Sequence, residues 1–247
     1  MPVHKISADF YQSLEVEWPC PACGQKTLQI DRDSFNSESS LETRRMQAED
    51  WFEPEMDKTV FSCMAHCSRS SCGEVVACSG QGGWREDWDY ENNNREFYAW
   101  HKPLYFIPTL HPFALPEQCP EEITIPLTAS FSVYLSQPGS AANLIRIAVE
   151  RMLTAIGIPE QDAKDKRIIL HQRIESLDGQ YAPYKDTLMA IKFLGNAGSH
   201  TYDEVVIEDI EAAFEMTEYV VNDLFSGRKE SIDVLTARLN GKFKKGP

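Results

Sequence analysis

The sequence predicts an α+β protein in which a small β module at the N-terminus precedes a mainly α-helical bundle. Two observations predict this order. Six of the seven cysteines fall within the first 83 residues, and apolar residues recur at helical spacing from Glu121 onward. We expect residues 1–83 to form the β module, residues 84–120 a connector rich in aromatic residues and proline, and residues 121–247 the helical domain.

Length and charge limit the function classes. The chain has 247 residues and a formal net charge of −14. Proteins that bind nucleic acid mainly through its phosphates carry a basic patch, and none dominates here. The sequence also lacks a run of about 18 apolar residues that would cross a bilayer, and its start lacks a signal-peptide core. We therefore predict a cytoplasmic protein without membrane contact, whose cysteines are reduced.

Reduced cysteines at short spacing favour a metal site over disulfides. Cys20-Pro-Ala-Cys23-Gly24 has the form of a zinc knuckle, in which two intervening residues let both thiolates reach one ion. A structural zinc ion takes four ligands, so a second pair is required. Cys72 is the first choice because Cys72-Gly73 repeats the Cys-Gly pattern, and Cys67 best completes the loop.

Two residues, Cys63 and His66, are alternatives to Cys67 in the second pair. Cys78 lies in an apolar run and Cys119 stands alone, so we interpret both as buried structural thiols. Cys20, Cys23, Cys67 and Cys72 together predict structural Zn²⁺ in a zinc-ribbon module. Four thiolates leave no open position for a catalytic water.

The remainder of the N-terminal half is expected to contain an exposed insertion, a strand and a turn. Residues 34–57 are rich in Ser and Glu and predict an exposed insertion with a short helix near residues 41–51. Residues 75–79 predict a strand, and Gly80-Gln-Gly-Gly83 predicts a turn. The aromatic residues between 84 and 113 favour packing between domains, and the prolines that follow rule out a continuous helix.

Six helices are expected in the C-terminal half, at residues 121–136, 141–156, 165–177, 184–194, 204–225 and 231–243. In the second of them Arg146 and Glu150 are spaced to form an ion pair. Between the fourth and fifth helices, Lys192-Phe-Leu-Gly195-Asn-Ala-Gly198-Ser-His200 predicts a tight polar bend. The last helix is amphipathic and is expected to cap the bundle or to contact a partner.

Three segments resemble the domain of unknown function 4145 family, a member of the HEPN-like group. They are Leu110-His-Pro-Phe-Ala-Leu-Pro, Ala142-Asn-Leu-Ile-Arg-Ile-Ala-Val-Glu-Arg and Lys192-Phe-Leu-Gly-Asn-Ala-Gly-Ser-His. The second is similar to the family's Arg-x-x-x-Glu helix and the third to its Gly-Asn-x-x-x-His signature. The resemblance covers roughly residues 100–226. It implies an antiparallel HEPN-like helical bundle that often dimerises, frequently with an N-terminal zinc ribbon.

The resemblance also bears on function, because many HEPN-like proteins are metal-independent ribonucleases of prokaryotic defence systems. Their motif pairs an Arg with a His that transfers protons. Aligned on Asn196 and His200, the Arg position here is Gly195. The resemblance thus implies a catalytic set of His200, Asn196 and a substitute cation, Arg146 or Lys192, or else a protein without nuclease activity.

We favour a non-catalytic, zinc-stabilised binding or regulatory protein of a prokaryotic defence or restriction system. It would bind a protein partner and form a homodimer through its helical domain. A ribonuclease using His200, with RNA as substrate, is the alternative. A weaker alternative is an acidic mimic of nucleic acid, built from a stripe of acidic residues at Glu204, Glu208, Asp209, Glu211, Glu215 and Glu218.

Overall fold

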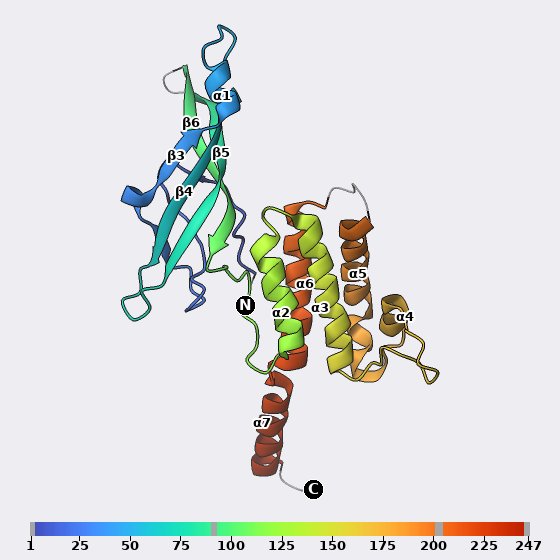
Figure 1. The fold of residues 1–247 in the computed structure, drawn as a ribbon. Helices are drawn as coiled ribbons and strands as arrows, with labels where there is room; N and C mark the ends of the chain where they lie inside the picture. The colour runs from blue at the N-terminus through green and yellow to red at the C-terminus, as the bar shows by residue number, and fades with distance from the viewer. Residues whose placement is uncertain (1–2, 90–92, 201–204, 245–247) are drawn as a thin grey trace. The chain divides into compact units, whose positions relative to one another are not determined.

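A computed structural model describes residues 3–89, 93–200 and 205–244 of the chain (Figure 1). The chain divides into two compact units. The strand-rich unit holds residues 4–112 together with the short stretch 131–138, and the helical unit holds the other described residues from Phe113 onward. The fold class is therefore α+β, as the sequence predicts.

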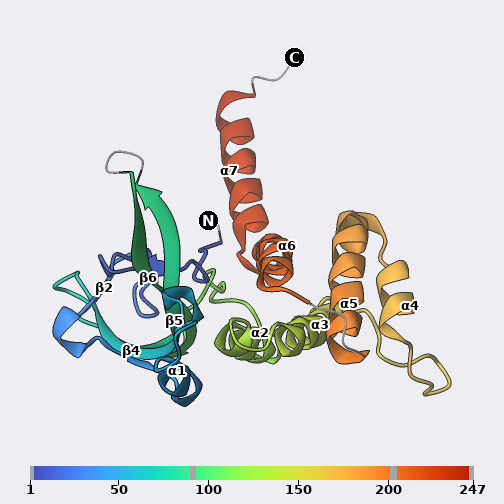
Figure 2. The same cartoon turned by 90° about the horizontal axis from the view of Figure 1, so that it is seen from above.

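An antiparallel sheet forms the strand-rich unit. Its long strands are β4 (Lys58–Cys67), β5 (Val75–Asp89) and β6 (Asn94–Ile107), and the strand order is β1-β6-β5-β4-β2. Short strands β1 (Phe10–Tyr11) and β2 (Leu28–Ile30) lie at the two edges, and β3 (Asn36–Ser39) also pairs with β4. Figure 2 shows that the sheet curls into a half-barrel.

Three short helical segments flank these strands. They are η1 (Arg32–Ser34), α1 (Leu41–Met46) and η2 (Pro54–Met56). The Ser40 hydroxyl caps α1 by accepting from the Thr43 backbone N–H at 3.2 Å. The predicted insertion thus does contain a short helix, but it also supplies β3.

The concave face of the sheet is filled with aromatic rings. Side chains alternate along β4, so that Phe61, Cys63, Ala65 and Cys67 are buried and the residues between them are exposed. Phe10 packs edge-on against Trp18 and Phe61 at centroid distances of 5.5 and 5.3 Å. His101 on β6 joins this cluster, 5.2 Å from the Phe10 ring.

Gly80–Gly83 lies within β5, so the prediction of a turn there is wrong. Gly80 faces Pro103 of β6, next to a register shift in the β5–β6 pairing. A Cβ on Gly80 would lie 2.1 Å from the Lys102 carbonyl oxygen and 2.7 Å from the Phe61 ring. The absent side chain lets β5 bend around the aromatic core without breaking the sheet.

Much of the stretch expected to be a connector is also part of this sheet. Residues 84–89 complete β5 and residues 94–107 form β6. The aromatic residues of the stretch pack within the strand-rich unit, for example Trp100, whose ring stacks under the Arg85 guanidinium at 4.6 Å. The high aromatic content reflects two long strands, which favour such residues.

The helical unit follows the predicted order with shifted ends. Its helices are α2 (Glu121–Val133), α3 (Pro138–Ala155), α4 (Leu170–Glu175), α5 (Lys185–His200), α6 (Ile207–Phe225) and α7 (Arg228–Phe243), with a 3₁₀ segment η3 (Gly179–Tyr184). α3 buries one stripe of apolar side chains, which includes Ile145, Val149 and Met152. The third predicted helix is much shorter, because it begins only at Leu170.

The expected bend at residues 192–200 is wrong, because α5 continues through it to His200. The glycines there serve close packing of α5 against α3. A Cβ on Gly198 would lie 2.4 Å from the Gly139 carbonyl oxygen, and one on Gly195 would lie 2.4 Å from Arg146 Cβ. The signature therefore marks a helix–helix contact.

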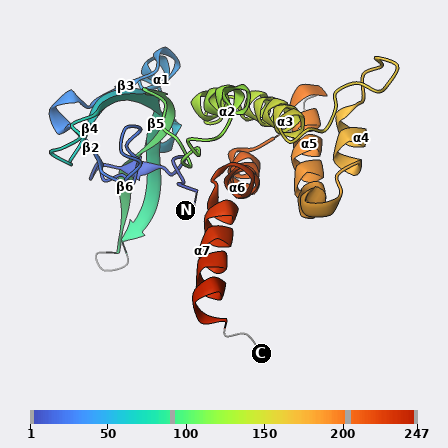
Figure 3. The same ribbon diagram turned by 90° about the horizontal axis from the view of Figure 1, so that it is seen from below.

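α7 differs from the other helices, because every described side chain along it is exposed. It extends away from α6 in both views of the helical unit (Figures 1 and 3). Among the helices of the described ranges, none is both long and apolar enough to cross a bilayer.

Candidate functional site

Two cysteine knuckles from distant parts of the sequence meet at one end of the sheet. The first lies in the turn before β2, where the Gly24 N–H donates to the Cys20 carbonyl at 2.8 Å. The second lies in the loop from β4 to β5, where the Gly73 N–H donates to the Arg69 carbonyl at 3.1 Å. Gly24 and Gly73 adopt φ of +68° and +63°, which explains why glycine follows a cysteine in both knuckles.

The four sulfur atoms have the spacing of a tetrahedral site. Sγ atoms of Cys20, Cys23, Cys67 and Cys72 all lie within 4.8 Å of one another. Cys20 and Cys72 are 3.7 Å apart, and Cys23 and Cys67 are 3.9 Å apart. Sulfurs bound to one zinc ion at about 2.3 Å lie about 3.8 Å apart, whereas a disulfide needs about 2.05 Å. The spacing fits metal ligands.

The surroundings of the sulfurs favour thiolates at two positions. The backbone N–H of Gln25 lowers the pKa of Cys23 to about 6, and the Thr27 hydroxyl, 3.1 Å from Cys67 Sγ, lowers the pKa of Cys67. Burial instead raises the pKa of Cys20 to about 12. A cation at the centre of the cluster would stabilise the buried Cys20 thiolate, because metal binding deprotonates thiols.

The alternative ligands lie elsewhere. Cys63 is buried on the concave face, directly opposite Cys78 across the β4–β5 pair, and His66 is exposed on β4. Cys119 is buried in the helical unit, where burial raises its pKa to about 11. Among the described residues, only the four predicted cysteines gather as a group of possible metal ligands of this kind.

Two of the residues proposed for catalysis, Arg146 and Asn196, lie on the adjacent helices α3 and α5. Arg146 is on α3, where Nη1 donates to Glu150 Oε1 at 2.6 Å, and Nε and Nη2 donate to Asn143 Oδ1 at 3.2 and 3.0 Å. Arg146 packs against Gly195, one residue before the half-buried Asn196. His200 ends α5, and its side chain lies outside the described part of the structure.

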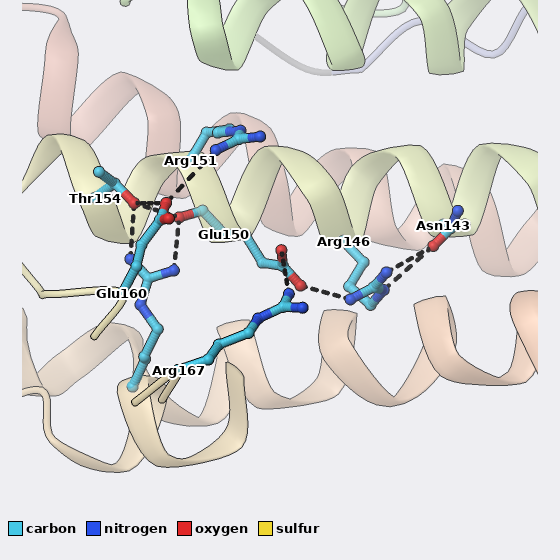
Figure 4. Close-up of polar contacts among 8 residues, drawn as sticks. Asn143, Arg146, Glu150, Arg151, Thr154, Glu160 and Arg167 are labelled. Carbon is cyan, nitrogen blue, oxygen red and sulfur yellow. Dashed lines mark hydrogen bonds and ion pairs between the residues drawn. The ribbon is translucent and has the colours of Figure 1, made fainter. Parts of the chain in front are cut away.

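Glu150 connects Arg146 to a larger charged network at the end of α3 (Figure 4). Glu150 Oε2 lies 3.8 Å from Arg167, and Glu160 lies 3.5 Å from Arg151 and accepts from Thr154 at 2.8 Å. Glu150, Arg151, Glu160 and Arg167 border a pocket of about 200 Å³. Each arginine has a carboxylate beside it, so the network links α3 to the loop that follows it.

Arg173 on α4 holds this network in place and was not singled out from the sequence. It is 3% exposed, and its Nη2 donates to Thr154 Oγ1 at 2.8 Å and to the Ile158 carbonyl at 2.9 Å. Its Nη1 donates to the Glu150 carbonyl at 3.2 Å. A buried arginine that caps carbonyls at a helix end is structural. The sequence of α4 is Leu-His-Gln-Arg-Ile-Glu, so no local pattern marks Arg173 as the buried residue.

Comparison with family models supports the division seen in the fold. Residues 128–244 match the domain of unknown function DUF4145, which confirms the resemblance found in the sequence. Residues 8–110 match a second domain of unknown function, DUF8608. No curated protein and no solved structure matches the chain.

Proposed function

We propose that this chain, in which a DUF8608 region precedes a DUF4145 domain, is a zinc-stabilised binding protein whose metal is structural. The observation that carries the proposal is the convergence of four cysteine sulfurs within 4.8 Å. Four thiolates occupy every position of a tetrahedral zinc ion, so a substrate or water would find none open. Thiolate ligands also favour zinc over magnesium or calcium.

Metal analysis tests this proposal directly. We expect about one zinc ion per full-length chain, and Cys72→Ser is expected to lose most of it. Cys78→Ala is the matched control, since Cys78 is buried in the neighbouring strand and outside the cluster. A folded, metal-free wild-type protein, or equal zinc content in Cys72→Ser and wild type, would contradict the zinc site.

The surface that supports a binding role is α7. Ile232, Leu235, Leu239 and Phe243 form one apolar stripe at helical spacing and are 43–66% exposed. Isolated helices of this length are marginal in water, because most helices in proteins are stabilised by packing. We therefore infer that a partner covers the apolar stripe of α7.

We propose that the partner is a second copy of the chain, with each α7 lying along α6 of the other copy. α6 carries six acidic and no basic residues, whereas α7 carries four basic and two acidic ones. The outer face of α6 also offers Met216 and Tyr219, 39% and 52% exposed, to the apolar stripe. At 19 and 16 residues the two helices are similar in length.

Sedimentation of matched variants tests the dimer. We expect the wild type to dimerise, Leu235→Asp to be monomeric, and Val234→Asp to remain dimeric. Val234 is more exposed than Leu235, at 69% against 43%, but lies on the opposite side of α7. A monomeric wild type at micromolar concentration, or a dimeric Leu235→Asp, would exclude this contact. This dimer uses the acidic face of α6. Of the acidic stripe expected from the sequence, Glu204 lies outside the described residues.

The alternative is a ribonuclease that uses His200, with Asn196 positioning RNA and Arg146 or Lys192 as the cation. Its supporting observation is the contact that brings Arg146 against Gly195 beside Asn196. Against it, the guanidinium donors of Arg146 are engaged by Asn143 and Glu150. If the wild type cleaves RNA and His200→Ala does not, the result would favour the nuclease. Equal RNA cleavage by the wild type and His200→Ala would exclude it.

A role in prokaryotic defence rests on the HEPN-like resemblance. It is tested by identifying the partners that the chain captures from the native host.

A further inference from the structure

The pocket at the C-terminal end of α3 is rich in arginine, although the chain as a whole is acidic. It has a volume of about 200 Å³, and Arg151, Arg167 and Arg173 line it together with Glu150 and Glu160. The formal net charge of the chain is −14. Guanidinium groups gathered in a hollow of such a chain point to an anionic ligand.

Backbone contacts fix the loop that forms one wall of this pocket. Gln161 and Arg167 form an antiparallel bridge, and the Ile168 N–H donates to the Glu160 carbonyl at 2.8 Å. These contacts hold Glu160 and Arg167 on neighbouring stretches of the loop, beside the end of α3. A ligand would therefore meet side chains that the backbone has already positioned, which lowers the entropy cost of binding.

Two of the arginines are accessible to a ligand. The side chains of Arg151 and Arg167 are 50% and 80% exposed. Arg151 Nη1 lies 3.5 Å from Glu160 Oε1, and Arg167 Nη2 lies 3.8 Å from Glu150 Oε2 (Figure 4). Charge-assisted hydrogen bonds between such groups measure about 2.7–2.9 Å. Both contacts are therefore loose, and most N–H groups of the two guanidinium ions remain open to an anion.

The two glutamates have closer partners than these arginines. Glu150 accepts from Arg146 at 2.6 Å, and Glu160 accepts from Thr154 at 2.8 Å. Arg173, which donates to carbonyls at the end of α3, adds a buried positive charge. With Arg146 included, four arginines stand against two glutamates, a surplus of two positive charges. A phosphate monoester, with about −1.5 to −2 charges at pH 7, matches that surplus.

We propose that this pocket binds a phosphate group, either of free phosphate or of a small phosphate monoester. Arg151 and Arg167 donate to its oxygens. A tetrahedral phosphate has enough acceptor oxygens for two guanidinium groups at once, whereas one carboxylate has only two. The pocket is smaller than the sites of drug-sized ligands, which begin at about 300 Å³, and suits a compact anion. The inference rests on neither the zinc site nor the dimer.

Calorimetric titration of the full chain with inorganic phosphate and with acetate tests the proposal. We expect phosphate to bind about tenfold or more tightly than acetate, because acetate has one charge and two acceptor oxygens. Arg151→Gln and Arg167→Gln are each expected to weaken phosphate binding about tenfold, as the loss of a hydrogen bond between charged groups implies. Lys164→Gln is the control, since it removes the same charge from an exposed position of the same loop that does not line the pocket.

Three results would overturn the proposal. They are no binding of phosphate at millimolar concentration, equal affinity for phosphate and acetate, and equal weakening by Lys164→Gln and Arg167→Gln. The last would mean that the charge of the loop attracts anions without a defined site. Arg167 is largely exposed, so Arg167→Gln decides the matter if Arg151→Gln fails to fold. Methyl phosphate then identifies the source, because a monoester site binds it more tightly than inorganic phosphate and a site for free phosphate binds it less tightly.

Discussion

Two glycine-rich stretches, Gly80–Gly83 in β5 and Gly195–Gly198 in α5, lie in different units and have different structural roles. Both bring the backbone closer to a neighbour than any side chain would allow, to a carbonyl of β6 in one case and of α3 in the other. In the sheet, the close approach lets the strands bend around the aromatic core. In the bundle, it removes the space between two helices. Glycine runs in this chain therefore mark close contacts within regular elements.

The two units can be followed separately in solution. All five tryptophans, at positions 18, 51, 84, 88 and 100, belong to the strand-rich unit, and the long helices belong to the helical unit. Tryptophan fluorescence therefore reports the first unit, and far-UV circular dichroism at helical wavelengths reports mainly the second. Variants in either glycine stretch should affect one signal more than the other.

The largest effect is expected from Gly195→Arg, which places the arginine of the nuclease motif into the chain. Its Cβ alone would meet Arg146 Cβ at 2.4 Å, so α5 and α3 must separate. We expect a loss of about 3 kcal/mol or more in the free energy of unfolding, seen by circular dichroism in urea. Gly241→Arg in α7 is the control, because no atom lies within 4 Å of its Cβ position. A fully stable Gly195→Arg would refute the close packing of these helices.

A smaller loss, about 2 kcal/mol, is expected for Gly80→Ala in the sheet. The new methyl group would overlap the Lys102 carbonyl and force β6 to shift. Urea denaturation followed by tryptophan fluorescence measures this change, and Gln81→Ala, on the exposed side of the same strand, should stay within about 0.5 kcal/mol of wild type. Equal stability of the two variants would mean that β5 does not need glycine to bend.

In the exposed helix α7, replacing a glycine should increase stability instead of lowering it. Gly241→Ala adds a methyl group where nothing is near, so only helix propensity changes. We expect α7 to be stabilised by about 0.5–1 kcal/mol. Slower amide hydrogen exchange confined to α7 would show it, whereas destabilisation would indicate a contact at Gly241.

The smallest effect concerns the pH dependence of the strand-rich unit. Burial lowers the pKa of His101 below its ordinary value of 6.5, so the unfolded chain binds more protons than the folded one below that pH. The stability of this unit should therefore decrease as the pH falls below about 6.5. His101→Gln should make fluorescence-detected stability less dependent on pH between about 7.5 and 5. An unchanged pH dependence would mean that His101 is protonated without cost in the folded state.

The sequence predicts the two knuckles well, because Cys-x-x-Cys and Cys-Gly are local patterns with one physical cause. It also predicts most helices from their apolar spacing. The turn predicted at Gly80–Gly83 and the bend predicted at Gly195–Gly198 are wrong. From a single sequence, a glycine that permits a turn cannot be distinguished from one that permits a close contact. The row formed by Thr59, Gly82 and His101 could not be predicted, because these residues meet only through the register of three strands.

The knuckles also have a kinetic consequence. Cys20 and Cys72 are 52 residues apart, so an ion held by both would tie together the ends of about half of the strand-rich sequence. Loop closure of this kind removes conformational freedom from the unfolded chain. Strands β2, β3 and β4 all lie inside the closed loop. A bound ion would therefore disfavour the unfolded chain relative to the folded unit, and removal of the metal is expected to shorten the lifetime of the folded strands.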